Sequence, residues 1–317
     1  MVGIMDYRNQ TLTNRFILLG LTDIQYLQVF YVLIFSVIYI ITVLGNSLLI
    51  IAVLINVHLQ TPMYFFLTNL AVIDICCASA VVPEILVNTL SLDKSVSLAE
   101  CALQMFLSLV LGTTECLILA VMAYDRFVAI CRPLHYNAVT NKRVCILLTA
   151  FCWSIGFINS TIHMALTFQL PFCRSHHIDH YFCEIPPILQ LSCSDTWYNE
   201  VSVYISACLI VISSFCLTLA SYIYIISTIF RIHSTQGRQK TFSTCASHLT
   251  VVCMYYGTIM AMYLGPHSAY SPERAKITSI IYTSVTPMLN PIIYSVRNKD
   301  IKHTITVKMI KKCVVWF

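Results

Sequence analysis

Long apolar stretches alternate with short polar segments along the whole chain. A membrane-spanning helix needs about 20 mostly apolar residues, and seven stretches of the sequence reach that length. The segments between them are short, apart from the polar stretch 169–201. The pattern predicts an all-α membrane protein built as a seven-transmembrane helix bundle. The predicted spans are 29–55, 63–90, 101–130, 144–168, 202–230, 242–265 and 276–296.

Two shorter segments flank the bundle, which we place at 29–296. Residues 1–28 lack the basic start and short apolar core of a cleavable signal peptide, so the first span is expected to be an uncleaved anchor. This segment holds an N-glycosylation acceptor at Asn9, although such triplets are common by chance. The tail at 297–317 mixes basic residues with apolar ones at helical spacing. This mixture predicts a short amphipathic helix over 299–312, lying on anionic membrane lipid.

Composition agrees with a membrane protein and argues against other classes. The chain is 58% hydrophobic and 10% charged, whereas a soluble domain carries about 25% charged residues. The net charge of +5 is too modest to indicate nucleic acid. The sequence shows no Gly-rich phosphate loop, nucleophile motif or metal-ligand set, so it does not favour an enzyme.

The distribution of Lys and Arg predicts the orientation of the bundle. Cytoplasmic loops carry an excess of basic residues, and most of the 19 Lys and Arg follow spans three, five and seven. We therefore expect a plasma-membrane protein with an extracellular N-terminus and a cytoplasmic C-terminus. The basic residues on the inner side are Arg126, Arg132, Lys142, Arg143, Arg231, Arg238, Lys240, Arg297, Lys299, Lys302, Lys308, Lys311 and Lys312.

Four of the 15 cysteines are placed differently from the rest. Most cysteines lie in spans, where Cys acts as a small apolar residue. Cys101 opens span three, and Cys173, Cys183 and Cys193 lie in the long outer loop. An even set on the oxidising face predicts two disulfides, and the spacing alone allows three pairings. In the tail, Cys313 is a candidate lipid anchor or a plain thiol.

The long loop also contains a group of potential metal ligands. His, Cys and Glu side chains together can bind Zn²⁺ or Cu²⁺. The alternative is that the histidines are solvated and the cysteine is in a disulfide, and we favour it and assign no metal. The residues are His176, His177, His180, Cys183 and Glu184.

Polar residues within the spans are candidate functional residues, because charges in a bilayer are costly. Asp74 and Glu115 are carboxylates, and Asn46 and Asn290 lie at similar depth. Two nearby carboxylates in a low dielectric need a cation or a proton. The four residues therefore indicate either a Na⁺-type or protonated site, or a hydrogen-bonding cluster that only holds the helices together.

The end of span three carries the most distinctive string of the sequence. Residues 122–131, from Met122 to Cys131, resemble the MAYDRYVAIC signature of odorant receptors, with Phe127 in place of the usual Tyr. These receptors are a branch of the rhodopsin-like G-protein-coupled receptors. Other matching strings place the resemblance in the class II, tetrapod-type branch, and it runs from about Asn9 to Lys302. They are Gly45-Asn46, Thr61-Pro-Met-Tyr-Phe-Phe-Leu67, Ser221-Tyr222, Pro287-Met-Leu-Asn290-Pro291-Ile-Ile-Tyr294, and Lys240 to His248 with Thr241 in place of Ala.

The resemblance implies a signalling mechanism. Small, mostly neutral volatile ligands would bind in the outer half of the bundle, and a stimulatory, olfactory-type G protein would raise cAMP. Arg126 would be held by Asp125 at rest and released toward Tyr222 and Tyr294 on activation. The resemblance also selects Cys101–Cys183 and Cys173–Cys193 among the possible disulfide pairings.

Helical spacing, together with the resemblance, indicates which residues bind the ligand. They lie toward the outer half of spans three, five, six and seven, although such stripes are often plain core packing. None of them is charged, which favours a neutral ligand over an amine or a carboxylate. The set is Met105, Ser108, Leu109, Gly112, Thr113, Ser206, Ile210, Tyr256, Ile259, Met260, Tyr263, Ile280 and Thr283.

Two alternatives to an odorant receptor remain at this point. A transporter or channel would also be apolar, but many transporters have repeated halves with paired broken helices. Here the helix-breaking prolines concentrate in span seven, at Pro287 and Pro291. A non-olfactory chemoreceptor of the same fold is the nearer alternative.

Overall fold

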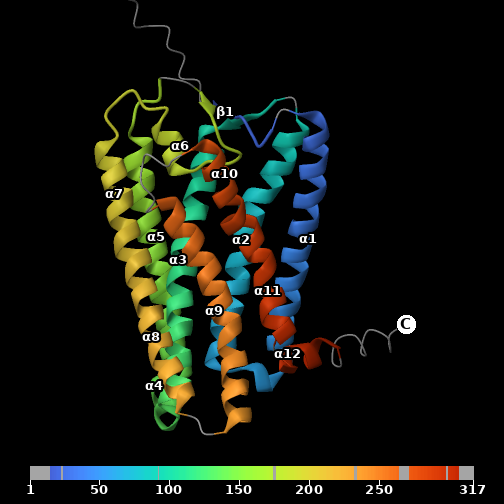
Figure 1. Cartoon of the computed structure of the whole chain (residues 1–317). Helices are drawn as coiled ribbons and strands as arrows, with labels where there is room; N and C mark the ends of the chain where they lie inside the picture. The colour runs from blue at the N-terminus through green and yellow to red at the C-terminus, as the bar shows by residue number, and fades with distance from the viewer. Residues whose placement is uncertain are drawn as a thin grey trace, which may run out of the picture.

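The helices of this chain run side by side as one bundle in a computed structural model (Figure 1). The structure describes residues 15–22, 24–91, 93–173, 176–231, 234–263, 271–297 and 299–306. Asn9, Cys313 and the second half of the expected amphipathic helix lie outside the described residues.

Every predicted span is helical over its described residues, so the seven-transmembrane bundle is confirmed. Five of the helices are long and apolar enough to cross a membrane, and α9 has a shorter apolar part at Cys245–Ala261. The helices are α1 (Gln25–Ile55), α2 (Pro62–Leu90), α3 (Leu98–Cys131), α5 (Lys142–Phe168), α7 (Trp197–Ala207) continued by α8 (Ser213–Phe230), α9 (Thr235–Tyr263), and α10 (Pro272–Ile280) continued by α11 (Thr286–Arg297).

Polar capping residues explain why some helices begin before the apolar stretch. Ser97 accepts from the Glu100 backbone N–H while the Glu100 carboxylate accepts from the Ser97 N–H, which is a capping box at the start of α3. Asn141 caps α5 and Ser271 caps α10 by a single bond each: the side-chain oxygen accepts from the backbone N–H of Val144 and of Arg274, respectively. Apolar periodicity alone does not detect these first turns.

A short π-helical turn interrupts span five and another interrupts span seven. The first is Cys208–Ile212, between α7 and α8, and the second is Ile281–Val285, between α10 and α11. Pro287 lies just after the second turn and cannot donate the hydrogen bond that would close it onto Thr283. A π turn at this place accommodates the missing backbone N–H donor. The helix irregularity that the prolines predict therefore lies a few residues before them in the sequence.

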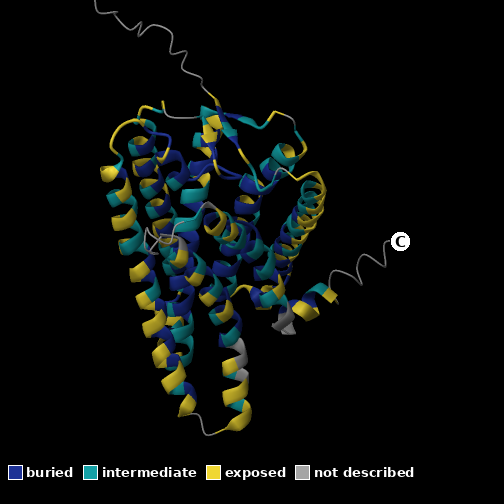
Figure 2. Cartoon of the chain, turned by 45° about the horizontal axis from the view of Figure 1, so that its top comes forward, coloured by how far each residue is buried: buried dark blue, intermediate teal, exposed yellow. Residues whose placement is uncertain are grey.

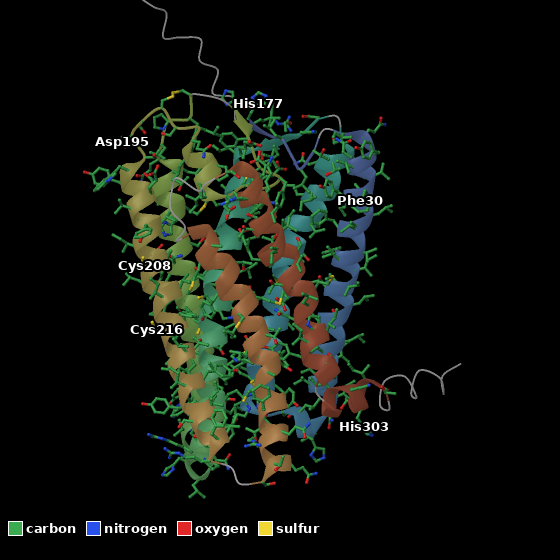
Figure 3. The ribbon with its side chains drawn as sticks, viewed as in Figure 1. Phe30, His177, Asp195, Cys208, Cys216 and His303 are labelled. Carbon is green, nitrogen blue, oxygen red and sulfur yellow. A yellow bond between two sulfur atoms is a disulfide. The ribbon has the colours of Figure 1, made fainter. Side chains whose placement is uncertain are left out.

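The outside of the bundle is apolar, as contact with lipid requires. In Figure 3, Phe30 on α1 and Cys216 on α8 point away from the other helices, and both side chains are exposed. Figure 2 shows that burial is concentrated on the faces that the helices turn toward one another. Soluble monomers rarely expose so large an apolar surface, so this surface is the one that faces the membrane.

The two ends of the bundle differ, and we name them by what they carry. The loop end holds the long loop 169–196, which includes the short helix α6 (Ile185–Leu189). A small sheet also lies there, in the order β2 (Ser95–Ser97), β1 (Arg15–Leu18), β3 (His177–Ile178). The β1 strand is antiparallel to β2 and parallel to β3. The sequence did not predict this sheet, because strands of two to four residues are too short to show a period.

The tail end holds the turns between helices and a short final helix. It contains η1 (Val57–Leu59), η2 (Pro133–His135), α4 (Tyr136–Val139) and α12 (Lys299–His303). Ile301 of α12 is fully buried against the core, and the Asn56 side chain donates to Thr304 Oγ1 at 2.8 Å. The described part of the tail thus has one buried apolar face, as expected of an amphipathic helix.

Candidate functional site

A cavity lies inside the loop-end half of the bundle. Its walls come from α3, α5, α7, α9 and the Ile281–Val285 turn, and residues 182–185 of the long loop close it. The lining is mostly apolar with a few hydroxyl groups, which is the usual composition of a small-molecule site. The sequence-predicted ligand residues that line it are Met105, Ser108, Leu109, Gly112, Thr113, Ser206, Ile210, Ile259 and Thr283.

Three of the predicted ligand residues face elsewhere. Tyr256 donates its hydroxyl to a backbone carbonyl of α3 at 2.9 Å, and the neighbouring Tyr255 lines the cavity instead. Met260 packs against the central core, and Ile280 packs against a cluster of α1 and α2. Adjacent residues of a helix point about 100° apart. A prediction that is shifted by one residue therefore selects a residue that packs against a neighbouring helix instead of one that lines the cavity. The Tyr263 side chain lies outside the described residues.

Two polar residues of α5, which the sequence analysis missed, also line the cavity. His163 Nε2 lies 2.8 Å from Ser206 Oγ, and Asn159 Nδ2 donates to Thr113 Oγ1 at 3.1 Å. The two α5 residues are four apart and therefore share one helix face. Their polar character in an apolar span was a usable signal, since buried polar groups seek partners.

Close packing of α5 on α3 brings these groups together. A Cβ on Gly156 would lie 2.5 Å from Thr114 Oγ1 and 2.9 Å from the Val110 carbonyl oxygen. Only glycine fits between the two helices at this level. Ser160, one turn further along α5, donates to the Phe106 carbonyl at 2.9 Å and fixes the same contact.

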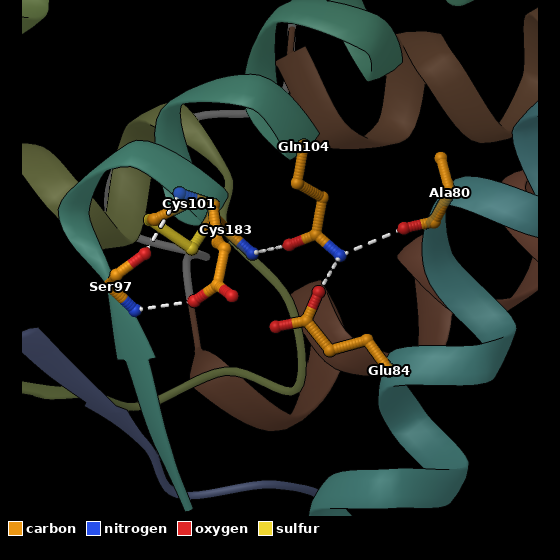
Figure 4. Close-up of a disulfide and its surroundings, with 7 residues drawn as sticks. Ala80, Glu84, Ser97, Cys101, Gln104 and Cys183 are labelled. Atoms are coloured by element: carbon orange, nitrogen blue, oxygen red, sulfur yellow. Dashed lines mark hydrogen bonds between the residues drawn. A yellow bond between two sulfur atoms is a disulfide. The ribbon is translucent and has the colours of Figure 1, made fainter.

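The Cys101–Cys183 disulfide fixes the loop that closes the cavity (Figure 4). The Cys183 N–H donates to Gln104 Oε1 at 2.8 Å, and the Gln104 amide donates to the Ala80 carbonyl at 3.0 Å and to Glu84. The loop is therefore tied to α3 and, through Gln104, to α2. The second disulfide joins Cys173 and Cys193 within the loop. Both pairings agree with the expected ones.

The loop also places a carboxylate at the edge of the cavity. Glu184 accepts hydrogen bonds from Tyr282 at 2.7 Å and from Ser279 at 3.3 Å. The carboxylate is therefore bound to span seven as well as lining the cavity. Helical spacing predicts no charged residue in the ligand site, because Glu184 lies in a loop that this spacing cannot place.

His180 is buried in the same loop, between the rings of Tyr181 and Phe182. Burial, reinforced by the charge of Lys276, lowers the pKa of His180 to about 3. The ring is therefore neutral at physiological pH, and its 3.9 Å separation from Glu184 is not an ion pair. Among the described residues, no group of three or more His, Cys, Asp or Glu is arranged to hold a metal ion.

The four polar residues expected at mid-membrane are buried at the centre of the bundle. Asn290 donates to both carboxylate oxygens of Asp74 at 3.0 Å. Glu115 lines the inner end of the cavity, and its Oε1 has no hydrogen-bond partner in the described part of the chain. Asn46 donates to the Pro287 carbonyl at 3.1 Å. In a regular helix the residue at position 291 would donate its N–H to the Pro287 carbonyl, but Pro291 has no N–H. The Asn46 side chain of α1 therefore supplies the donor.

A separate group of polar residues lies at the tail end, around the end of α3. Asp125 Oδ1 accepts from the Tyr136 hydroxyl at 3.1 Å, and Tyr222 lies 2.7 Å from His248 Nδ1. Burial and the Asp125 carboxylate raise the pKa of Tyr136, so it remains a donor. Three buried atoms of the predicted switch residues have no hydrogen-bond partner among the described residues. They are Asp125 Oδ2, Arg126 Nε and the Tyr294 hydroxyl.

The predicted resting contact between Asp125 and Arg126 is not among the ion pairs of the described residues. Tyr136 is instead the partner that Asp125 has. The charge of Arg126 still acts on Tyr222 and Tyr294, which lie around it. The predicted switch residues are therefore gathered at one place, where Asp125 and Tyr222 have other partners and the Arg126 Nε and the Tyr294 hydroxyl have none among the described residues.

Comparison with known proteins shows to which family the chain is similar. A family model described as "Olfactory receptor" matches residues 35–312. The chain is 47% identical to "Olfactory receptor 2F1" of Homo sapiens over 294 residues, which are 93% of each chain. It is 48% identical to "Olfactory receptor 5B21" of Homo sapiens, over 93% of this chain and 95% of the relative. It is 45% identical to "Olfactory receptor 2B6" of Mus musculus, over 94% and 95%.

Proposed function

This chain belongs to the olfactory receptor family, and on that premise we propose how it receives and transmits a signal. It is an odorant receptor of the membrane and not an enzyme. Small, mostly neutral volatile ligands bind in the cavity of the loop-end half. The tail end activates a heterotrimeric G protein of the stimulatory, olfactory type, which raises cAMP.

The observation that carries the proposal is that α3 belongs to both sites. Ser108, Gly112 and Thr113 line the cavity, and Asp125-Arg126 end the same helix at the other face of the bundle. Thr113 and Arg126 are about 20 Å apart at the rise of an α-helix. A small rotation or shift of α3 on ligand binding therefore reaches both places.

The distribution of charge supports the orientation that this function needs. The basic residues after spans three, five and seven belong to the tail end, where they face the anionic inner leaflet and the G protein. The loop end with its disulfides then faces the oxidising outside. We place the receptor in the plasma membrane on this basis.

The cavity contains carboxylates, yet a neutral ligand remains the better match. Glu184 already accepts hydrogen bonds from Tyr282 and Ser279, which satisfy its charge in part. The remaining walls are mostly apolar; their other polar groups are hydroxyls, the Asn159 amide, the His163 ring and, at the inner end, the Glu115 carboxylate. A ligand amine or carboxylate would have to lose its hydration against these walls, which costs several kcal/mol.

The tail-end group serves as the coupling switch. Asp125 limits the movement of Arg126 at rest, and ligand binding lets Arg126 turn toward Tyr222, Tyr294 and the G protein. The unpaired Arg126 Nε and Tyr294 hydroxyl support this exchange, since each gains a hydrogen bond from it. Arg126→Ala is expected to reach the surface and bind odorant, yet fail to raise cAMP. Normal signalling by that variant would disprove the switch.

Asp74 and Glu115 would hold a Na⁺ ion or share a proton at mid-membrane. Both are fully or almost fully buried, and Glu115 Oε1 is without a hydrogen-bond partner among the described residues. Two such carboxylates cannot both remain ionised without a cation, and carboxylate oxygens suit a hard cation. A Glu115→Gln variant whose signalling and Na⁺ dependence both match the wild type would contradict this assignment.

A cAMP assay tests the proposed function as a whole. The receptor is expressed with the olfactory-type stimulatory G protein and exposed to an odorant panel, and surface expression is measured in parallel. A dose-dependent rise in cAMP that requires the G protein is expected. Ligand-driven ion or solute flux without the G protein would favour a transporter or channel instead.

A further inference from the structure

One wall of the cavity carries hydroxyl groups whose hydrogen-bond directions are set by α5. Ser108 and Thr113 belong to α3 and Ser206 to α7, and all three line the cavity. Asn159 and His163 of α5 stand behind two of them. Which atom donates in each contact decides what the wall can offer to a ligand.

The Ser206 hydroxyl is made a donor by its two contacts. It donates to the Val203 carbonyl at 3.0 Å, and a carbonyl can only accept. A hydroxyl has one hydrogen and two lone pairs. Ser206 Oγ is therefore the acceptor in its 2.8 Å contact with His163, and His163 Nε2 carries the hydrogen. A ligand oxygen that competes with the Val203 carbonyl would receive the same Ser206 hydrogen.

Asn159 acts on the Thr113 hydroxyl as His163 acts on Ser206: it donates to the oxygen, so the hydroxyl is left to act as a donor toward another group. The Asn159 amide donates to Thr113 Oγ1 at 3.1 Å, which occupies a lone pair of Thr113 and leaves its hydrogen free. Among the described residues, no group accepts that hydrogen. The imidazole and the amide of α5 thus act alike, since each turns a hydroxyl of the opposite helix into a donor.

Ser108 completes the wall without any fixed partner. A serine in a helix often donates to the carbonyl four residues earlier, as Thr114 does to Val110 at 2.7 Å. Ser108 Oγ is buried and makes no hydrogen bond with the described part of the chain. A buried hydroxyl without a partner is costly, so a bound acceptor that satisfies it is favoured.

We propose that this wall selects ligands that carry a hydrogen-bond-accepting oxygen, such as ketones, ethers, esters and alcohols, over hydrocarbons of the same shape. Ser108, Thr113 and Ser206 donate to the oxygen, and Asn159 and His163 are positioning residues that keep two of these hydroxyls as donors. The inference rests on the proposed odorant-binding function of the cavity and names its ligand class. The apolar remainder of the lining accommodates the hydrocarbon part.

Matched ligand pairs test the selection. Methyl ketones of varied length are compared with the alkenes in which =CH2 replaces the carbonyl oxygen. Ethers are compared with the hydrocarbons in which CH2 replaces the oxygen, alcohols with those in which CH3 replaces the hydroxyl, and esters with those in which both oxygens are replaced in these ways. The readout is the ratio of the two EC50 values in the cAMP assay. For the wild type we expect the oxygenated member to be about 10-fold more potent, as one or two neutral hydrogen bonds would give.

Two small substitutions locate the effect on the wall. Ser108→Ala and Thr113→Val each remove a hydroxyl with little change of volume, and each should reduce the EC50 ratio by about 3- to 10-fold through weaker response to the oxygenated ligand. Ser154→Ala is the matched control, because Ser154 is on the α5 face away from the cavity and donates to the Ala150 carbonyl at 2.8 Å. It should leave the ratio unchanged.

His163→Phe tests the positioning role by a change that packing alone would not cause. Ser206 loses the donor that fixes its direction, so the ratio for alcohols, which can also donate, should fall less than the ratio for ketones. Equal potency of oxygenated and hydrocarbon ligands in the wild type would overturn the inference, as would an unchanged ratio in both hydroxyl variants. A receptor that reaches the surface but raises cAMP with no ligand class would instead disprove the proposed function, and the inference with it.

Discussion

At the loop end, covalent bonds and a sheet hold distant parts of the chain together, whereas at the tail end single hydrogen bonds do so. The loop end has two disulfides, a three-stranded sheet and the Lys276–Asp179 ion pair. The tail end has the Tyr136–Asp125 and Tyr222–His248 contacts. A disulfide contributes about 2–5 kcal/mol to stability and a hydrogen bond about 1 kcal/mol.

The difference matches the two tasks of a receptor. A binding site benefits from a fixed shape, because ordering a loop on binding would reduce affinity. The side chains of a coupling site must change hydrogen-bond partners at a small cost in free energy. Each contact there contributes about 1 kcal/mol, so a ligand that binds the two conformations with slightly different affinity can shift the balance between them. Under the proposed function, the loop end is therefore organised for recognition and the tail end for rearrangement.

Breaking the covalent tie should have the largest effect. Cys101→Ser removes the disulfide to Cys183, which closes a chain separation of 82 residues, and should cost about 2–5 kcal/mol. We expect loss of most surface receptor, measured by flow cytometry of a tagged chain. Cys216→Ser, at an exposed free thiol of α8, is the control and should be neutral. Normal surface level and potency in Cys101→Ser would show that the loop does not need the bond.

Lower pH should weaken the loop end through His180. The pKa of its buried ring is about 3 in the folded protein and 6.5 otherwise, so its contribution is full above pH 6.5 and declines as the pH falls toward 3. At about pH 5 the loss is about 2 kcal/mol. We expect a lower Tm of the purified receptor at pH 5 than at neutral pH, and a smaller difference in His180→Phe. His177→Phe, at an exposed position, should retain the wild-type difference.

A single contact at the tail end should change coupling more than stability. Tyr136→Phe removes the hydroxyl that donates to Asp125, which leaves the carboxylate freer to restrain Arg126. The EC50 for cAMP should rise by about 2- to 10-fold, the equivalent of one hydrogen bond, with unchanged surface level. Tyr224→Phe, on the exposed face of α8, is the control. Higher basal cAMP in Tyr136→Phe would reverse the assigned direction.

The ion pair of the loop end should matter least. Lys276 Nζ lies 2.7 Å from Asp179 Oδ1, and the Lys276 and Asp179 side chains are 17% and 51% exposed. Ion pairs that water reaches contribute about 0–1 kcal/mol. Lys276→Met should therefore change Tm only slightly and potency by less than about 3-fold. A large effect on either would mean that the disulfides alone do not fix the loop.

The sequence predicts the spans well because the signal is long and strong. Each span contains about 20 apolar residues, and the two disulfide pairings follow from the family resemblance. Side-chain directions are harder, because neighbours on a helix differ by about 100°. This explains why Tyr256 was predicted to line the cavity where Tyr255 does so.

Contacts that depend on tertiary packing were not predictable from periodicity. Asn159 and His163 line the cavity only because Gly156 lets α5 approach α3 closely. Glu184 reaches the same cavity because a disulfide folds its loop inward. Asn46 bonds to the Pro287 carbonyl, which lies 241 residues away. Each contact requires the relative placement of two elements, which the local pattern does not contain.

The small sheet at the loop end has a consequence for the order of assembly. Its central strand β1 is synthesised before its partners: β2 follows two of the spans, and β3 follows four. Closing such long loops slows folding. During biosynthesis β1 can pair with β2 once α2 has been inserted, but the sheet stays incomplete until α5 has been inserted and the following loop has folded back onto β1. A formed sheet thus marks a chain whose first half is correctly assembled, and an unpaired β1 marks one that is not.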